Sequence, residues 1–174
     1  ALGSGLAHEE RIDPYPADQG FRFQIDALNG RIYEAINNGA YQAGFSSDQS
    51  VCEAAFHKYF NMLEELNALL QDGHAYLTGE AFAEADLRQN TTLYRHETVY
   101  YLRIKLIGAK IFNYPHLRRW LCRVYALPGV AENGSLTHWL QGHFRAVMKR
   151  RYPACPPSQP KPYLEAYHHP ELTN

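Results

Sequence analysis

Apolar side chains recur at three- and four-residue steps from Asp18 onward, the spacing that places them on one face of an α-helix. The first helix is predicted to begin at Asp18, a candidate N-cap, and to end at residues 37–39 (Asn-Asn-Gly), because Asn and Gly tolerate positive φ. A second helix is predicted from about Ser46, whose spacing to Gln49 is that of a capping box, to a stop at Gly73. Its expected buried stripe comprises Val51, Phe56, Tyr59, Phe60, Leu63, Leu66 and Leu70.

Three further helices are expected downstream. The third is predicted from about Ala83 to about Leu106 and is rich in Tyr, Arg and His, so one of its sides is expected to line a cleft or an interface. The fourth is predicted to start at Pro115 and to end before Pro128-Gly129, and the fifth covers residues 136–149. No alternating strand pattern bounded by hairpin turns is present. The sequence therefore predicts an all-α bundle of five to seven helices.

Two segments flank the predicted bundle, which covers residues 18–151. Residues 1–17 are punctuated by Gly and Pro and are expected to be a linker. Six of the ten prolines fall in residues 152–174, a density that favours an extended tail over a regular helix.

Charge and cysteine usage exclude several classes of protein. The 174 residues carry a formal net charge of −1, so a strong generic attraction to nucleic acid or anionic membranes is not expected. No run of about 18 apolar residues and no signal-peptide pattern is present. Cys52, Cys122 and Cys155 form no CxxC pair, and this sparse, odd set is typical of a reducing cytoplasm, the expected compartment.

Candidate chemistry centres on the 13 tyrosines, because the nine histidines form no HExxH metal motif and no GxSxG or phosphate-binding loop is present. Tyr41, Tyr94, Tyr100 and Tyr101 lie among polar and cationic residues. A phenol offers an aromatic face and a hydrogen-bonding tip, which suits a flat aromatic substrate. Each tyrosine alone is more often a core or interface residue. The residues by themselves thus indicate a helical domain with a tyrosine-rich, partly polar wall, and no metal site.

Several motifs add a family resemblance. Residues 76–80 (Tyr-Leu-Thr-Gly-Glu) and 83–87 (Ala-Glu-Ala-Asp-Leu), with the later Tyr-Pro-His-Leu and Leu-Pro-Gly-Val segments, resemble the helical C-terminal domain of glutathione transferases. Residues 37–45 (Asn-Asn-Gly-Ala-Tyr-Gln-Ala-Gly-Phe) and 84–95, which contain Thr91-Thr92, are similar to the xi class, the glutathionyl-hydroquinone reductases.

The resemblance implies a two-domain enzyme. Its N-terminal thioredoxin-like domain binds glutathione and carries a catalytic cysteine in a Cys-Pro-Trp motif, which none of the three cysteines here matches, so no catalytic residue is assigned. The resemblance also implies that Tyr41 hydrogen-bonds the phenolic oxygen of an aromatic glutathione conjugate, and that the protein is a homodimer. The expected substrate-binding residues are Tyr41, Tyr94, His96, Tyr100, Tyr101, Lys105, His143 and Phe144.

Departures from the family pattern leave open a divergent transferase with another aromatic substrate, and two further alternatives remain. Ala83 stands where the family has a threonine N-cap, and the segment after the long helix keeps only Lys105 of the family's His-Phe-Lys-x-Asn. One alternative is a non-catalytic module of the same fold that binds a protein or a small molecule. The other is an unrelated helical protein, which would lack a long, bent helix starting near Ala83.

Overall fold

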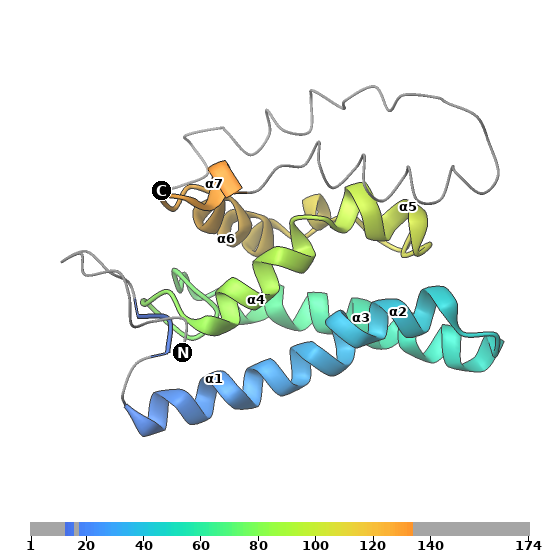
Figure 1. Cartoon of the computed structure of the whole chain (residues 1–174), viewed down its shortest axis with the longest axis horizontal. Coiled ribbons are helices and arrows are strands. Elements are labelled where there is room, and N and C mark those ends of the chain that lie inside the picture. The colour runs from blue at the N-terminus through green and yellow to red at the C-terminus, as the bar shows by residue number, and fades with distance from the viewer. Residues whose placement is uncertain (1–12, 16–17, 134–174) are drawn as a thin grey trace.

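The structure, a computed structural model, describes residues 13–15 and 18–133. Its first helical rod consists of α1 (Gln19–Ile32), the π-helical turn η1 (Tyr33–Asn37) and α2 (Asn38–Phe45), which follow one another without a break (Figure 1). The Asp18 side chain caps α1 as predicted, since its Oδ1 accepts from the Phe21 backbone N–H at 2.6 Å.

The predicted helix end at residues 37–39 is wrong. Asn37 and Asn38 keep right-handed helical φ values of −66° and −83°. The chain makes one wide turn there instead of stopping. Gly39 contributes to this turn, because a Cβ at this position would lie 3.1 Å from the Glu34 carbonyl oxygen. The Asn-Asn-Gly run therefore marks a change of helical register.

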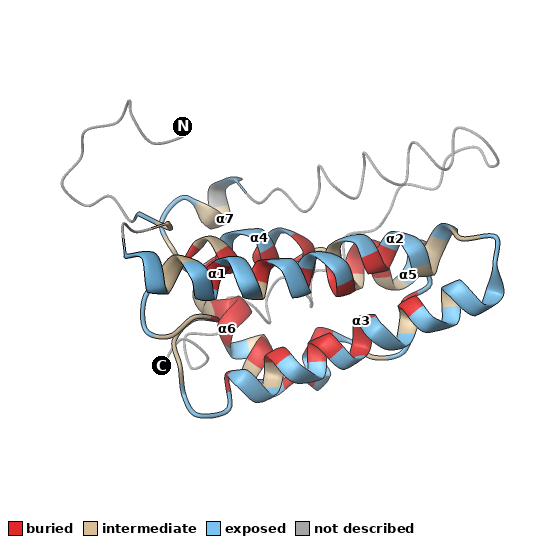
Figure 2. Cartoon of the chain, turned by 90° about the horizontal axis from the view of Figure 1, so that it is seen from below, coloured by how far each residue is buried: buried red, intermediate tan, exposed pale blue. Residues whose placement is uncertain are grey.

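α3 (Gln49–Leu69) runs alongside this rod, as two views show (Figures 1 and 2). Its N-cap is Asp48 and not Ser46, where the capping box was predicted. The Asp48 carboxylate accepts from the backbone N–H groups of Ser50 and Val51. The Ser46 hydroxyl accepts from the Asp48 N–H instead. Bonds from Ser50 and Val51 lower the pKa of Asp48. Val51 is 42% exposed and lies outside the buried stripe in which it was predicted. α3 ends at Leu69 with Leu70 as its C-cap, before the predicted stop at Gly73, which adopts a φ of +98° in the turn that follows.

The predicted third helix is divided into three segments. α4 (Glu84–Leu93) begins after Ala83 as predicted, and a turn then leads into the π-helical η2 (His96–Tyr100) and the short α5 (Tyr101–Arg103). The helical stretch ends at Ile104 and not at Leu106, because Lys105 adopts a φ of +62°. Leu87 of α4 and Leu102 of α5 face the surface, with 46% and 63% of their area exposed.

The last described elements are η3 (Ile111–Asn113), α6 (Pro115–Tyr125) and α7 (Val130–Asn133). Pro115 occupies the first turn of α6 as predicted. The predicted helix over residues 136–149 and the tail over 152–174 lie outside the described residues. Within residues 18–133, every regular element is a helix, which confirms the all-α class; the one bridge there pairs Tyr76 with Gly79. None of the helices in this range is long and apolar enough to cross a membrane.

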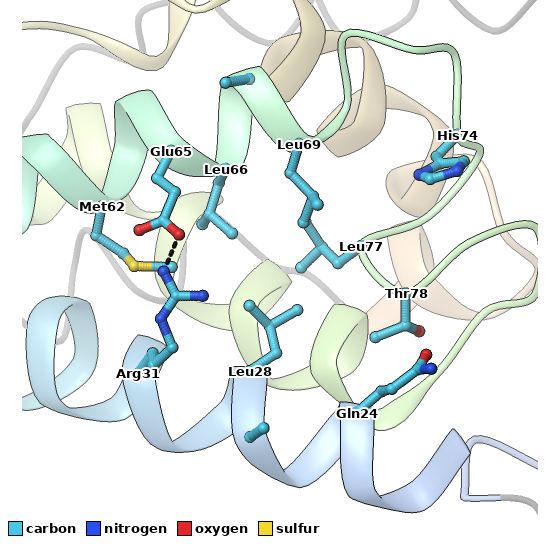
Figure 3. A pocket seen from close by; sticks show the side chains of 12 residues that line it. Gln24, Leu28, Arg31, Met62, Glu65, Leu66, Leu69, His74, Leu77 and Thr78 are labelled. Carbon is cyan, nitrogen blue, oxygen red and sulfur yellow. Dashed lines mark ion pairs between the residues drawn. The ribbon is translucent and has the colours of Figure 1, made fainter. Parts of the chain in front are cut away.

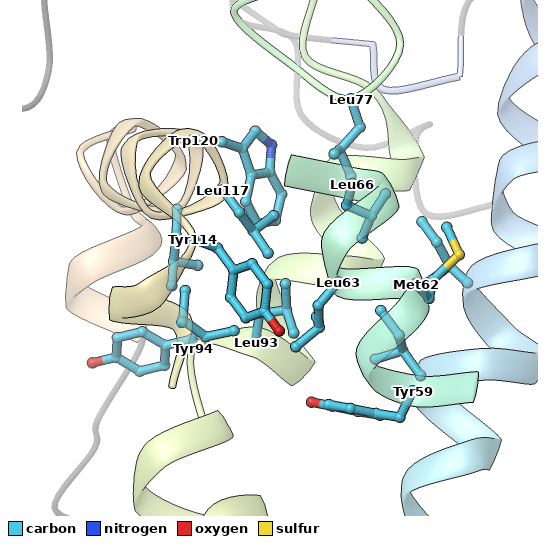
Figure 4. Packing of buried hydrophobic residues seen from close by; sticks show 14 of the residues in the cluster. Tyr59, Met62, Leu63, Leu66, Leu77, Leu93, Tyr94, Tyr114, Leu117 and Trp120 are labelled. Carbon is cyan, nitrogen blue, oxygen red and sulfur yellow. The ribbon is translucent and has the colours of Figure 1, made fainter. Parts of the chain in front are cut away.

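The core forms where α3, α4 and α6 meet (Figures 2 and 4). Leu63 and Leu66 of α3, Leu93 of α4 and Trp120 of α6 are at most 1% exposed. Burying one such side chain contributes about 1.5–3 kcal/mol.

Asp86 of α4 is a buried anchor for three segments. Its carboxylate accepts from the backbone N–H groups of Leu77 and Ala83, both at 2.9 Å, and from the Trp120 indole N–H at 2.7 Å. Asp86 lies in the first turn of α4, where a carboxylate complements the helix dipole, and its side chain is fully buried. Burial raises the pKa of Asp86, although the three donors oppose this effect. Ala83 has no side-chain oxygen to cap α4, so only the reciprocal half of a capping box is present, in which the Asp86 carboxylate accepts from the Ala83 N–H.

Candidate functional site

An aromatic cluster lies where α2 meets the η2–α5 segment. The Tyr41 and Tyr100 ring centroids are 6.2 Å apart with an edge-to-face angle of 77°, and Tyr41 stacks on Phe45 at 6.1 Å. Tyr41 and Phe45 are 49% and 60% exposed, whereas Tyr100 is 4% exposed. The cluster therefore presents one tyrosine hydroxyl and one apolar ring on the surface, above a buried second tyrosine.

Gly44 allows α2 to approach this segment closely. A Cβ at Gly44 would lie 3.2 Å from the Ile104 Cα, and its clash with the Ile104 side chain would be closer still. Lys105 follows Ile104 directly and is exposed. The close contact thus brings Tyr41, Tyr100 and a flexible cationic side chain to the same end of the bundle.

The buried phenol of this cluster is held in its neutral form. Burial raises the pKa of Tyr100 to about 12, and a hydrogen bond with the Tyr41 side chain adds to the rise. The positive charge of Arg95, whose guanidinium carbon lies 5.7 Å from the Tyr100 ring centroid, and a hydrogen bond from Thr92 oppose it. At neutral pH, Tyr100 is therefore a proton-bearing hydrogen-bond donor.

Two stretches that carry the xi-class resemblance are joined directly. The Asn37 side-chain N–H donates to the Thr92 hydroxyl at 2.7 Å, across 55 residues of sequence. Helical periodicity does not reveal this contact. The only signal in the sequence is the resemblance itself, which includes both residues.

Tyr94 was expected to contact the substrate, but its side chain is buried. It is 6% exposed and stacks on Tyr125 of α6, with ring centroids 5.3 Å apart. Burial raises its pKa, and a hydrogen bond with Tyr125 contributes. In the described structure Tyr94 packs in the core against α6 (Figure 4).

His96 is also a core residue, with no exposed surface. Its Nε2 lies 2.9 Å from the Ala109 carbonyl oxygen, so that nitrogen carries the proton and donates. Nδ1 accepts from the Tyr59 hydroxyl at 2.7 Å. Burial lowers the pKa of His96, which keeps the ring neutral. Because both ring nitrogens are hydrogen-bonded inside the core, His96 supports the fold of the described residues.

Of the remaining expected substrate-binding residues, the structure describes only some. Tyr101 is half-buried, with its ring edge-to-face with His96 and the Lys110 ammonium 5.7 Å from its ring centroid. His143 and Phe144 lie outside the described residues. The structure thus keeps Tyr41, Tyr100 and Lys105 at one end of the bundle and places Tyr94 and His96 in the core.

The part of the chain that the structure describes contains neither a cluster of metal ligands nor an activated cysteine thiol. No group of three or more His, Cys, Asp or Glu side chains there could hold a metal ion. Burial raises the pKa of the Cys122 thiol, which makes it less reactive. The Cys52 thiol donates to the Ser46 carbonyl oxygen at 3.4 Å. Cys155 lies outside the described residues.

A separate groove of about 560 Å³ lies between α1 and α3 (Figure 3). Leu28 of α1 faces Leu66 and Leu69 of α3 across it, and an Arg31–Glu65 ion pair joins the two helices. None of the expected substrate-binding residues lines this groove. The candidate site is therefore the aromatic cluster around Tyr41.

Within the described residues the chain is a helical bundle with a buried aspartate in the first turn of α4 and tyrosines at one end. The family model for the glutathione S-transferase C-terminal domain matches residues 35–128, more than half of the chain. The chain belongs to this family.

Several proteins similar to this chain are glutathionyl-hydroquinone reductases or xi-class transferases. The chain is 39% identical over 134 residues to the glutathionyl-hydroquinone reductase YqjG of Escherichia coli, a match that covers 77% of this chain and 40% of that protein. The glutathione-bound structure of YqjG superimposes with a TM-score of 0.76 at 35% identity, over 86% of this chain and 49% of that one. The xi transferase of Phanerochaete chrysosporium gives 0.73 at 34% identity, over 80% and 47%. The chain thus spans less than half of these relatives, and the resemblance to the xi class is confirmed.

Proposed function

We propose that this chain is the substrate-side domain of a glutathione-dependent reductase that acts on aromatic, hydroquinone-like glutathione conjugates. The observation that carries the proposal is the half-exposed Tyr41 side chain, next to the exposed Phe45 ring and above the buried Tyr100. Phe45 offers a face for an aromatic ring, and Tyr41 offers a donor for its phenolic oxygen. The similarity to glutathionyl-hydroquinone reductases supports the same reading.

The proposed reaction needs a cysteine that this domain does not supply. A cysteine thiolate of a thioredoxin-like partner domain attacks the sulfur of the conjugate, so that an S–S bond forms and the aryl C–S bond breaks. The aromatic fragment leaves with the electron pair and takes up a proton. A second glutathione thiolate then attacks the mixed disulfide, which releases the cysteine thiolate and glutathione disulfide. The aryl carbon is reduced, and two glutathione sulfurs are oxidised.

In this scheme Tyr41 stabilises the negative charge that develops on the phenolic oxygen as the aromatic fragment leaves. A hydrogen-bond donor placed where charge develops lowers the barrier. Lys105 adds a positive charge at the same end of the bundle. Glutathione is bound mainly by the thioredoxin-like domain of the parent protein, which acts in the cytoplasm as a homodimer.

A second candidate is a non-catalytic module that binds another protein. The observation that favours it is a set of large apolar side chains that remain more than half exposed, among them Phe23, Phe45 and Leu102. A protein partner could cover them. The two candidates differ in whether the aromatic cluster recognises a phenol.

Titration of the 174-residue chain with hydroquinone, followed by NMR, tests the proposal. We expect the ring resonances of Tyr41 and Phe45 to shift, and Tyr41→Phe to weaken binding about fivefold, since one hydrogen bond is worth about 1 kcal/mol. Tyr33→Phe is the matched control, because Tyr33 is similarly exposed, at 57%, on the same rod. Binding that is unchanged in Tyr41→Phe, or no binding at all, would reject the proposal in favour of the protein-binding module.

A further inference from the structure

The groove between α1 and α3 has the size of a small-molecule site (Figure 3). α3 packs directly on η1 and α2, and the groove opens where α1 faces the second half of α3. Its volume of about 560 Å³ lies within the range of about 300–1,000 Å³ that is typical of ligand pockets. Tyr41, Phe45 and Tyr100 do not line it, so the groove is separate from the aromatic cluster.

The middle of the groove is apolar and rests on the core. Leu66 is fully buried and Leu77 is 2% exposed, so these two side chains form a floor that belongs to the packed interior. Leu77 is held in place because its backbone N–H donates to the Asp86 carboxylate at 2.9 Å. Leu28 and Leu69, which lie across the groove from each other, are half-buried and 38% exposed (Figure 3). The fold therefore provides a preformed apolar recess whose walls are still accessible.

Polar side chains lie at both ends of this recess. At one end the Arg31–Glu65 ion pair joins the two helices, and at the other end Gln24, His74 and Thr78 lie together (Figure 3). A charged ligand would have to compete with Arg31 or Glu65 for its partner, and it would lose its hydration against the leucines. The distribution of charge therefore favours an uncharged ligand.

The Thr78 hydroxyl gives one end of the groove a hydrogen-bonding group. Its oxygen is buried, and it has no hydrogen-bond partner among the residues that the structure describes. Leaving a buried hydroxyl unpaired is unfavourable, because the group has lost its bonds to water. A ligand that carries a hydrogen-bond acceptor at this end would satisfy the Thr78 O–H.

We propose that the groove between α1 and α3 binds an uncharged, mostly apolar small molecule that carries one hydrogen-bond acceptor, such as a ketone oxygen, at the Thr78 end. The apolar body of the ligand packs between Leu28 and Leu69, over Leu66. Met62 also lines the groove, and its unbranched side chain adapts to different shapes, so the site selects a class of molecule. This site does not depend on the proposed function, because it uses other residues.

The first test uses Nile red, an uncharged aromatic ketone whose fluorescence rises in apolar surroundings. We expect the 174-residue chain to bind one dye molecule, and Ala27→Trp, which places a large side chain in the groove, to weaken binding at least tenfold. Ala54→Trp is the matched control, because Ala54 is exposed on α3 and does not line the groove. Both variants add the same apolar surface, so equal binding by the two would overturn the proposal.

The second test examines the selection against charge. Glu65→Gln leaves Arg31 without its partner, so this variant should bind the anionic dye 1-anilinonaphthalene-8-sulfonate about three- to tenfold more tightly than the wild type, and Nile red equally well. Glu64→Gln changes the net charge by the same amount, but Glu64 is exposed and does not line the groove. An equal gain in Glu64→Gln would show a response to net charge alone and would contradict the role of the ion pair.

The third test removes the Thr78 hydroxyl with little change of shape. Thr78→Val should weaken Nile red binding about three- to tenfold, which corresponds to the loss of one net hydrogen bond. Its resistance to urea should be unchanged or higher, because the hydroxyl has no partner to lose. Thr91→Val, on the exposed side of α4, should leave dye binding unchanged. Unchanged dye binding in Thr78→Val would overturn the proposed acceptor at that end.

Sedimentation of the wild type and Ala27→Trp separates a ligand site from a contact between two copies of the chain. We expect both proteins to have the same mass, and hydroquinone to shift the Tyr41 resonances equally in both. A wild-type dimer that Ala27→Trp converts into monomers would assign the groove to a contact between copies and overturn the proposal. Loss of the hydroquinone effect in Ala27→Trp would show that the two sites are not separate, which also contradicts it.

Discussion

Asp86→Ala is expected to lower the free energy of unfolding by about 3–5 kcal/mol, measured by urea denaturation at pH 7. Removing the carboxylate leaves the buried N–H groups of Leu77, Ala83 and Trp120 without their acceptor, and each unsatisfied buried donor costs about 1–3 kcal/mol. Asp72→Ala serves as the control, because its side chain is largely exposed and surface substitutions usually change stability by about 0.5 kcal/mol or less. Equal effects of the two substitutions would contradict the anchoring role of Asp86.

The unfolding free energy is expected to depend on pH through the same carboxylate. Folding raises the pKa of Asp86, so between the unfolded value and the folded value the folded state binds more protons than the unfolded chain. The unfolding free energy of the wild type relative to Asp86→Asn is therefore greatest below the ordinary aspartate pKa of about 3.9, and it falls as the pH rises through the folded pKa. A difference that increases over this range would show that the donors outweigh burial.

Gly44→Ala is expected to destabilise the protein by about 2–3 kcal/mol in the same denaturation experiment. The added methyl meets Ile104, including its Cα at 3.2 Å, so α2 must move away from the segment that carries Tyr100. Because α2 also carries Tyr41, this shift should separate the two rings and weaken hydroquinone binding.

Gly30→Ala provides the matched control for this substitution. Gly30 lies inside α1, and a Cβ there would meet nothing within 4 Å. Alanine is the better helix former, so this variant should be more stable by about 0.5–1 kcal/mol. If Gly44→Ala were as stable as Gly30→Ala, the close approach of α2 to Ile104 would not hold the aromatic cluster together.

Local signals were sufficient to predict where several helices begin. Asp18 caps α1, and Pro115 opens α6, because a capping oxygen and a fixed φ act within one turn of the chain. The N-cap of α3 was misplaced by two residues, since Ser46 and Asp48 both carry suitable oxygens and the backbone of Asp48 has the extended conformation that a cap needs. Periodicity thus predicted the elements, and side-chain competition decided their exact ends.

The errors at the site have a different cause, because they depend on partners far along the chain. The Asn-Asn-Gly run was expected to break a helix, yet Asn37 bonds to Thr92, 55 residues away, and the helix continues through a π turn. His96 was expected at the substrate, but Tyr59 and the Ala109 carbonyl hold it in the core. Tyr41 was singled out by the resemblance, and its exposure keeps it as the candidate ligand-binding residue.

The most direct test of the central claim compares the 174-residue chain alone with the same chain joined to a thioredoxin-like domain that carries a cysteine, in an assay for release of hydroquinone from glutathionyl-hydroquinone in the presence of glutathione. The account predicts turnover by the joined protein, in which the thioredoxin-like domain supplies the cysteine, a loss of about tenfold in its kcat/KM for Tyr41→Phe, and no turnover by the 174-residue chain alone. Turnover by the chain alone, or a joined protein that binds but does not reduce the conjugate, would contradict it.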